Sequence, residues 1–277
     1  MNALRVACHD NAKQLLERCE ARLLASAGVN HNILQIADVL TASNEYHTPP
    51  YWFCSVETNH SVLGCALHAA PDGLVISDLP FSAIDPLYRA IVENHLIPNR
   101  IVGSPEFSRK LAEKLGCSSG LSVKLSGSWT VGRLDEVGII QRQQGKLRQG
   151  SSKDQELVAE WGRRYGEERP AFLAVDQFML KKLKHGDLFF WDLNGPRTMI
   201  TISGRTAHGV RLSSVYTPTE FRARGYATSA VAGLSELLLA RGHQFVVLDW
   251  RSGDPVARVY GRVGFREIGT RHSYSHI

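Results

Sequence analysis

The chain has 277 residues, of which 43% are hydrophobic and 21% are charged. This length suggests one large domain or two of about 130 residues each, and this composition excludes a chain that is disordered throughout. No run approaches about 18 consecutive apolar residues, and the start of the chain lacks the apolar core of a signal peptide. We therefore expect a cytoplasmic protein with no membrane partner.

The distribution of charge is more informative than its total of +5. Residues 1–140 hold 11 Lys and Arg against 14 Asp and Glu, a balance of −3, whereas residues 141–277 hold 21 against 13, a balance of +8. A basic half suits a nucleic acid, an anionic lipid or a small ligand with several phosphates. The five cysteines form no CxxC pair and the 11 histidines show no metal-ligand spacing, so we expect neither a disulfide framework nor a metal site.

The first half predicts a mixture of helices and strands. Helices are expected at residues 10–24 and 31–40, then a hairpin of strands 51–57 and 62–68, a short strand at 74–77, and helices at 81–96 and 105–115. Residues 131–152 combine scattered Gly, Gln and basic side chains, which is typical of a connector. We place the domain boundary between residues 138 and 145.

The second half begins with two predicted helices, one that starts after Ser152 and one at residues 175–185. A hairpin follows at residues 188–204, and a third strand is expected near 210–216. The segment from Val215 to Gly242 is the most informative in the chain, because a strand, a short basic loop and an apolar helix follow one another there.

The loop of this segment predicts a binding site for a phosphate or a diphosphate. Arg222 and Arg224 bring positive charge, and Gly225 permits a close approach of the backbone at the start of the helix. The first amides of a helix lack intrahelical acceptors, and the helix dipole adds positive potential at that end. A plain strand-to-helix connection is the alternative interpretation of this loop.

The pattern Arg222-x-x-Gly225-x-Ala227 resembles the acetyl-coenzyme A (acetyl-CoA) loop of the GNAT superfamily of N-acetyltransferases. The lead-in VYTP, the strand at His243–Trp250 and the ending Y-x-x-x-G-F at Tyr260–Phe265 stand in the order and spacing of that superfamily. The resemblance covers residues 145–277. It implies an α/β (α+β) fold in which a mixed, largely antiparallel twisted sheet is flanked by helices.

The resemblance also assigns roles to individual residues. Tyr260 would lie near the thioester sulfur and act as the general acid for the departing thiolate. The backbone before the loop would bind the pantetheine arm, and the loop amides would hold the diphosphate. The cofactor-binding residues expected on this basis are Val215, Tyr216, Thr217, Arg222, Ala223, Arg224, Gly225, Tyr226, Ala227 and Thr228.

The attacking amine must be uncharged, since an ammonium group has no lone pair, and this calls for a base. Asp249, at the end of a predicted strand, is the candidate, and capping of the following turn is its alternative role. Tyr216 and His208 are weaker candidates. The superfamily often has an asparagine about seven residues before the tyrosine, where this chain has Gly253, so Ser252 or Asp254 is left to replace that contact.

The order of elements in the first half repeats that of the second, which suggests tandem GNAT-like domains. Where the second half has its phosphate loop, the first half has LVISDLPFSAID, with Asp78 and Asp85 and no glycine after Gly73. We therefore predict a degenerate domain at residues 1–138, which is structural and walls the acceptor site, and a catalytic domain at residues 145–277. The aromatic residues expected in that wall, or in the core, are Tyr46, Tyr51, Trp52 and Phe53.

The function expected from the resemblance is transfer of an acetyl group from acetyl-CoA to a primary amine, by direct attack in a ternary complex. The acceptor is expected to be a small or amino-acid-like molecule, with a protein lysine or N-terminal amine as the alternative. A coenzyme-binding sensor without catalysis is a second possibility. Nucleic acid is not expected as a partner, because the arginines of the basic half are not interleaved with aromatic residues. The sequence gives no expectation for the oligomeric state.

Overall fold

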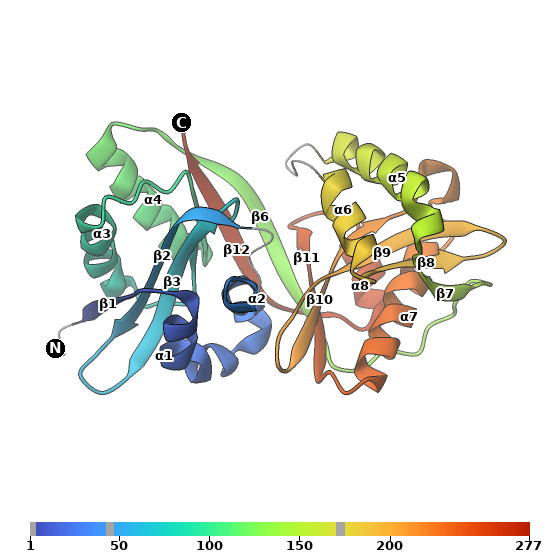
Figure 1. Ribbon diagram of the computed structural model, residues 1–277, viewed down its shortest axis with the longest axis horizontal. Helices are drawn as coiled ribbons and strands as arrows, with labels where there is room; N and C mark the ends of the chain where they lie inside the picture. The colour runs from blue at the N-terminus through green and yellow to red at the C-terminus, as the bar shows by residue number, and fades with distance from the viewer. Residues whose placement is uncertain (1–3, 43–46, 170–174) are drawn as a thin grey trace. The chain divides into compact units, whose positions relative to one another are not determined.

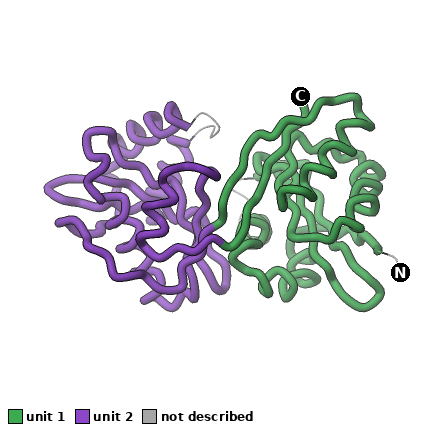
Figure 2. The backbone as a smooth tube through the Cα atoms, turned by 180° about the vertical axis from the view of Figure 1, so that it is seen from behind, with its two compact units in different colours: residues 1–131, 268–277 green, residues 132–267 purple. Residues whose placement is uncertain are grey.

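The computed structural model describes residues 4–42, 47–169 and 175–277 (Figure 1). The chain divides into two compact units, one of residues 1–131 with 268–277 and one of residues 132–267 (Figure 2). This division differs from the linear one at residues 138–145, because the last strand of the chain lies in the first unit. Tyr46, expected in the wall of the acceptor site, lies outside the described residues.

The first unit is built on a mixed sheet with helices on both faces. Its strands are hydrogen-bonded in the order β1 (Arg5–His9), β2 (Thr48–Glu57), β3 (Val62–Ala70), β4 (Gly73–Ile76), β5 (Arg100–Gly103), β12 (Arg266–His276) and β6 (Val123–Leu134). The strands β4 and β5 run parallel, whereas β1, β2, β3 and β4 are antiparallel in succession. The sequence patterns predict none of β1, β5, β6 and β12. The connector expected at residues 131–152 is wrong at both ends, because β6 extends to Leu134 and residues 146–149 form the strand β7 (Lys146–Gln149).

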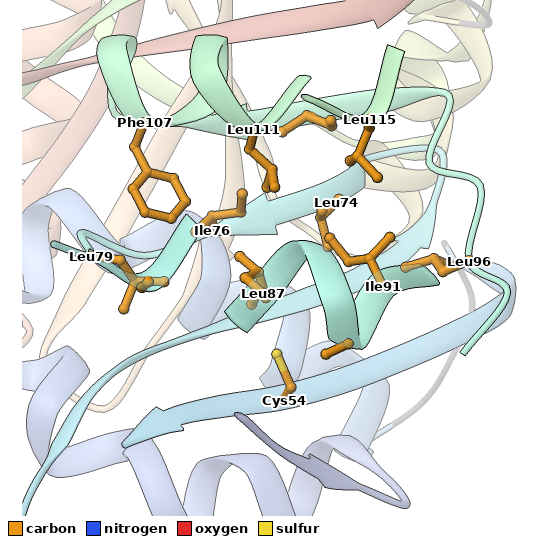
Figure 3. Close-up of a cluster of buried hydrophobic side chains, with 14 of the residues drawn as sticks. Cys54, Leu74, Ile76, Leu79, Leu87, Ile91, Leu96, Phe107, Leu111 and Leu115 are labelled. Atoms are coloured by element: carbon orange, nitrogen blue, oxygen red, sulfur yellow. The ribbon is translucent and has the colours of Figure 1, made fainter. Parts of the chain in front are cut away.

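Alternating side chains of this sheet supply two separate cores. Helices α1 (Ala12–Leu24) and α2 (Ala27–Ala42) pack on the face that carries Phe53 and Leu67. Helices α3 (Ile84–Glu93) and α4 (Pro105–Ser119) pack on the opposite face, where Leu87, Ile91 and Phe107 meet Cys54 and Ile76 (Figure 3). Period-two alternation along a strand places neighbouring residues on opposite faces, which is why Phe53 and Cys54 serve different cores.

The second unit repeats this plan. Its strands β7 (Lys146–Gln149), β8 (Leu188–Asp192), β9 (Pro196–Arg205) and β10 (Gly209–Tyr216) are antiparallel in succession, and β11 (Phe245–Arg251) runs parallel to β10. The end of β6 completes the sheet beside β11. Helices α5 (Gln155–Glu168) and α6 (Val175–Lys184) cover the face that carries Phe190, and α7 (Tyr226–Ala240) and α8 (Ala257–Val263) cover the face that carries Trp191.

Both units therefore follow the same order of elements, namely a strand, two helices, three antiparallel strands, a helix, a parallel strand and a helix. The repeat predicted from the sequence is confirmed, and so is the mixed and mostly antiparallel α/β class. Among the described residues, no helix combines the length and the apolar character needed to span a bilayer. The five cysteines are free thiols.

Candidate functional site

Strands β10 and β11 separate from one another within the sheet of the second unit. Their parallel ladder holds three pairs, from Gly209 with Phe245 to Arg211 with Val247, although both strands continue for several residues beyond. On its other side β10 has irregular pairing with β9 around Ser214, whose φ of 49° lies in the left-handed region. The last residues of β10, which the resemblance assigns to the pantetheine arm, thus lie where the two strands diverge.

The corner between β10 and α7 has an unusual backbone. Ala223 and Gly225 both lie in the left-handed region, with φ of 59° and 78°. Alternation of this kind turns successive amides towards one side and forms an anion-binding concavity. The first helical bond recorded at this end of α7 joins the amide of Ser229 to the carbonyl oxygen of Gly225, so the three preceding amides have no acceptor within the helix. Residues 222–225 are exposed, and Tyr226–Thr228, which carry these three amides, are half-buried.

Gln143, from the connector between β6 and β7, borders this corner. Its backbone amide donates to Ser229 Oγ at 2.9 Å, and a Cβ atom added at Gly225 would lie 3.2 Å from Gln143 Cγ and Nε2. The side-chain amide therefore stands beside the exposed backbone amides and can donate to the same anion. The sequence gives no signal for this residue beyond the glutamine content of the connector. We call the backbone of Ala223–Thr228 together with the Gln143 side chain the cradle.

The two arginines of the loop have different surroundings. The Arg222 guanidinium donates to the carbonyl oxygen of Thr217 at 2.8 Å and to both carboxylate oxygens of Glu168 at 2.6 and 2.7 Å. Arg222 thus braces the end of β10 against α5 in this structure. Arg224 is exposed and, among the described residues, has no recorded ion pair. Its charge is therefore available to an anion in the cradle.

Tyr260 lies in the core beside the diverging strands. Its side chain is buried between Trp250, with ring centroids 5.5 Å apart, and Phe265, at 6.1 Å. Desolvation by this burial raises the pKa of Tyr260 well above its usual value, so the hydroxyl group keeps its proton at neutral pH. Tyr260 and Phe265 of the Y-x-x-x-G-F ending thus form one aromatic cluster with Trp250 of β11.

Asp249 forms an ion pair with Arg211, a residue for which the sequence pattern gives no signal. Arg211 Nη2 donates to Asp249 Oδ2 at 2.5 Å, and both side chains are largely buried. Arg211 is the last residue of β10 paired with β11, so this ion pair joins the two strands at the point where they begin to separate. Asp249 therefore has a structural role beside any role as a base.

The weaker candidates for the base are poorly placed for it. Burial raises the pKa of Tyr216, which keeps its hydroxyl group protonated, and its ring packs edge-on against Trp161. His208 lies in the turn before β10, where its carbonyl oxygen accepts from Gln244, at the opposite end of the strand from the cradle.

The position of the missing asparagine is a tight turn. Gly253 has a φ of 82° and no neighbouring atom within 4 Å of an added Cβ. Asp254 Oδ1 accepts from the amide of Val256 at 2.9 Å, and Asp254 Oδ2 pairs with Arg169 at 3.2 Å. Asp254 therefore shapes the start of α8.

The corresponding corner of the first unit lacks a cradle. Between β4 and α3 no described residue has a positive φ, and a short 3₁₀ turn at Phe81–Ala83 replaces the loop. Asp85 pairs with Lys114 at 2.6 Å. The described residues contain no cluster of three or more His, Cys, Asp or Glu side chains suited to a metal ion.

Known proteins resemble this chain in part of its sequence and in its fold. Residues 198–274 match the family described as FR47-like protein. No curated protein sequence matches the chain. Among solved structures, the chain is similar to a GNAT-family acetyltransferase from Colwellia psychrerythraea, with a TM-score of 0.57 and 11% identity over 99% of both chains.

Two further structures are similar over nearly the whole chain. A GCN5-related N-acetyltransferase from Sphaerobacter thermophilus has a TM-score of 0.60 and 16% identity, with 99% of this chain and 95% of that chain covered. A tandem GNAT protein from the clavulanic acid biosynthesis pathway has a TM-score of 0.55 and 14% identity, with 99% and 98% covered. The fold of these structures therefore extends over the whole of this chain, and residues 198–274 match the FR47-like family.

Proposed function

We propose that the second unit binds acetyl-CoA and directs transfer of its acetyl group to a primary amine. The observation that carries this proposal is the cradle, in which two left-handed residues lead into the start of α7, whose first amides have no acceptor within the helix, beside the divergence of β10 and β11. The names of the similar structures from Colwellia psychrerythraea and Sphaerobacter thermophilus, both acetyltransferases, support the same activity.

The described residues fit the two polar parts of the coenzyme. The cradle offers backbone amides and the Gln143 side-chain amide to a diphosphate, and Arg224 adds an exposed positive charge. The backbone of Val215–Thr217, at the end of β10, offers hydrogen bonds to an extended arm as an added strand would. When bound, the coenzyme supplies an acetyl thioester, which is activated for transfer to an amine.

Tyr260 is the proposed general acid. Its hydroxyl group is kept protonated by burial, so it can donate a proton at Oη to a departing thiolate. The surrounding Trp250 and Phe265 exclude water from this side of the site. Nothing in this arrangement needs a metal ion.

Asp249 is the proposed base for the amine. Its carboxylate lies at the start of the divergence. Leu248 and Trp250 pack with α7 and α8, so alternation along β11 places Asp249 on the opposite face of the sheet. Arg211 competes for this carboxylate, so a proton reaches Asp249 only when the ion pair loosens. Replacement of Asp249 by Asn should lower activity mainly on the acidic limb of the pH profile, and an unchanged profile would remove Asp249 from the mechanism.

The proposed acceptor is a small or amino-acid-like amine, and a protein lysine or N-terminal amine is the alternative. A second candidate function is a coenzyme-binding sensor. Gly253 has no side chain to replace the superfamily's asparagine, and Asp254 is engaged by Arg169 and by the backbone of Val256. Of the two replacements considered above, only Ser252 is then left for the contact near the thioester, and a site without this contact favours coenzyme binding without turnover.

Calorimetry with acetyl-CoA, followed by a screen for free thiol release, distinguishes these functions. The screen contains small amines, amino acids and lysine-containing peptides. An acetyltransferase binds the coenzyme and releases thiol with one acceptor class, whereas a sensor binds it without release. Absence of binding by the wild-type protein would refute both functions, and release confined to peptides would select the protein acceptor.

A further inference from the structure

The last turn of α5 lies over the place where β10 and β11 diverge. Glu168, its final residue, binds Arg222 with two hydrogen bonds of 2.6 and 2.7 Å. The next residue, Arg169, binds Asp254 at 3.2 Å. One turn earlier, the ring of Tyr165 packs edge-on against Tyr216, with centroids 5.9 Å apart.

These two ion pairs reach opposite sides of the opening between the strands. Arg222 belongs to the loop that follows β10, and Asp254 belongs to the loop that follows β11. Two consecutive residues of opposite charge therefore tie α5 to both loops. We call Glu168, Arg169 and their partners Arg222 and Asp254 the clasp.

The clasp is built from contacts that open readily. The side chains of Glu168 and Arg222 are 42% and 43% exposed, and those of Arg169 and Asp254 are 37% and 21% exposed. Exposed ion pairs contribute little to stability and are screened by salt. By contrast, the Arg211–Asp249 pair, which joins the two strands where they begin to separate, is largely buried.

We propose that the clasp closes the opening in the free protein and that the coenzyme must displace it, with Arg222 exchanging the Glu168 carboxylate for the diphosphate. This inference rests on the proposed coenzyme site. Arg222 stands at the first position of the loop that forms the cradle, so its guanidinium faces two competing anions, a carboxylate of the same chain and the ligand. The clasp thus lowers the apparent affinity for coenzyme and slows its entry.

The test compares Glu168→Gln with Glu167→Gln in the full-length protein. Glu167 is adjacent on the same helix, carries the same charge and pairs with Arg163 instead of a loop at the opening. Both variants change the net charge equally, so a difference between them isolates the clasp. Calorimetry gives the Kd for coenzyme A, stopped-flow tryptophan fluorescence gives its association rate, and hydrogen exchange of the free protein reports the last turn of α5.

Glu168→Gln should bind coenzyme A more tightly than Glu167→Gln by up to about fivefold, the equivalent of about 1 kcal/mol for an exposed pair. It should also associate faster, and the end of α5 should exchange faster in the free protein. Equal or weaker binding by Glu168→Gln, or unchanged exchange, overturns the clasp.

A second pair of variants repeats the test with the opposite change of charge. Arg169→Gln should bind coenzyme A more tightly than Arg163→Gln, because the recorded partner of Arg163 is Glu167 on the same helix, whereas Arg169 pairs with Asp254 at the opening. If the wild-type protein and all four variants fail to bind coenzyme A, the proposed function is refuted, and the proposal for the clasp, which depends on it, is refuted as well. Binding by the wild type without a difference within either pair overturns the clasp alone.

Discussion

Gly225 tests the cradle directly, because its backbone conformation can be perturbed without removing a charge. Gly225 has a φ of 78°, and a left-handed conformation costs a residue with a Cβ atom about 1–2 kcal/mol. In Gly225→Ala the new Cβ would lie 3.2 Å from the Gln143 side chain, whose flexible end can move away. The strain at the corner is therefore the main effect, and relief of that strain moves the amides that hold the diphosphate.

Binding of the diphosphate requires the variant to return to the left-handed conformation, so the cost of that conformation is subtracted from the binding free energy. Gly225→Ala should therefore raise the Kd for acetyl-CoA about 5- to 30-fold in calorimetry. Gly242→Ala is the matched control, because Gly242 follows the other end of α7, has a φ of 95° and has no atom within 4 Å of an added Cβ. It should lower the free energy of unfolding by a similar amount and leave the Kd unchanged. The cradle would be refuted if Gly225→Ala bound acetyl-CoA with the same Kd as the wild type, provided that Gly242→Ala showed the expected loss of stability.

Three further outcomes follow from the described contacts. The bonds from Arg18 hold the pKa of Glu57 at about 2, below its ordinary value, so the stability from its ionised form is full above about pH 4.5 and is lost as the pH falls towards 2. In urea unfolding, Glu57→Gln should therefore remove about 1–3 kcal/mol at pH 7, a range discounted for the half-exposed Arg18, and much less at pH 2; an equal loss at both pH values would contradict this. Tyr260→Phe keeps the aromatic packing, so the melting temperature and the Kd for acetyl-CoA should stay nearly constant while kcat for thiol release falls about 100-fold, and an unchanged kcat would exclude the hydroxyl group as the acid. Arg224→Gln should raise the Kd for acetyl-CoA about tenfold, whereas Arg241→Gln, an exposed control at the far end of α7, should not; equal effects would indicate only long-range attraction.

Much of the fold is predictable because the long elements have clear periodicity. The strands Tyr51–Glu57 and Val62–His68, and the helix that follows Gly225, lie where the sequence places them. Five strands, β1, β5, β6, β7 and β12, are missed. β12 has the sequence REIGTRHSYSH, and its membership of the first unit depends on pairing with residues more than 160 positions earlier, which no local pattern reports.

For the candidate site, the loop pattern predicts the corner between β10 and α7, and the left-handed backbone at Ala223 and Gly225 supplies the physical reason for it. The assigned roles of Tyr260 and Asp249 stay predictions. The sequence could not indicate Gln143, Arg211 or Glu168 as neighbours of these residues, because each comes from a separate element and is brought close only by the tertiary fold.

The place of β12 links the synthesis of the chain to its folding. Residues 268–277 belong to the first unit, where Tyr274 pairs with Ile101 and the amide of Ile277 donates to Ser122. The first unit therefore stays incomplete after residues 1–131 have left the ribosome, and the edge of β5 that pairs with β12 stays unpaired until residues 268–277 are translated. A nascent chain that stalls before residue 268 exposes that edge to other strands, so removal of residues 268–277 should promote aggregation through the first unit.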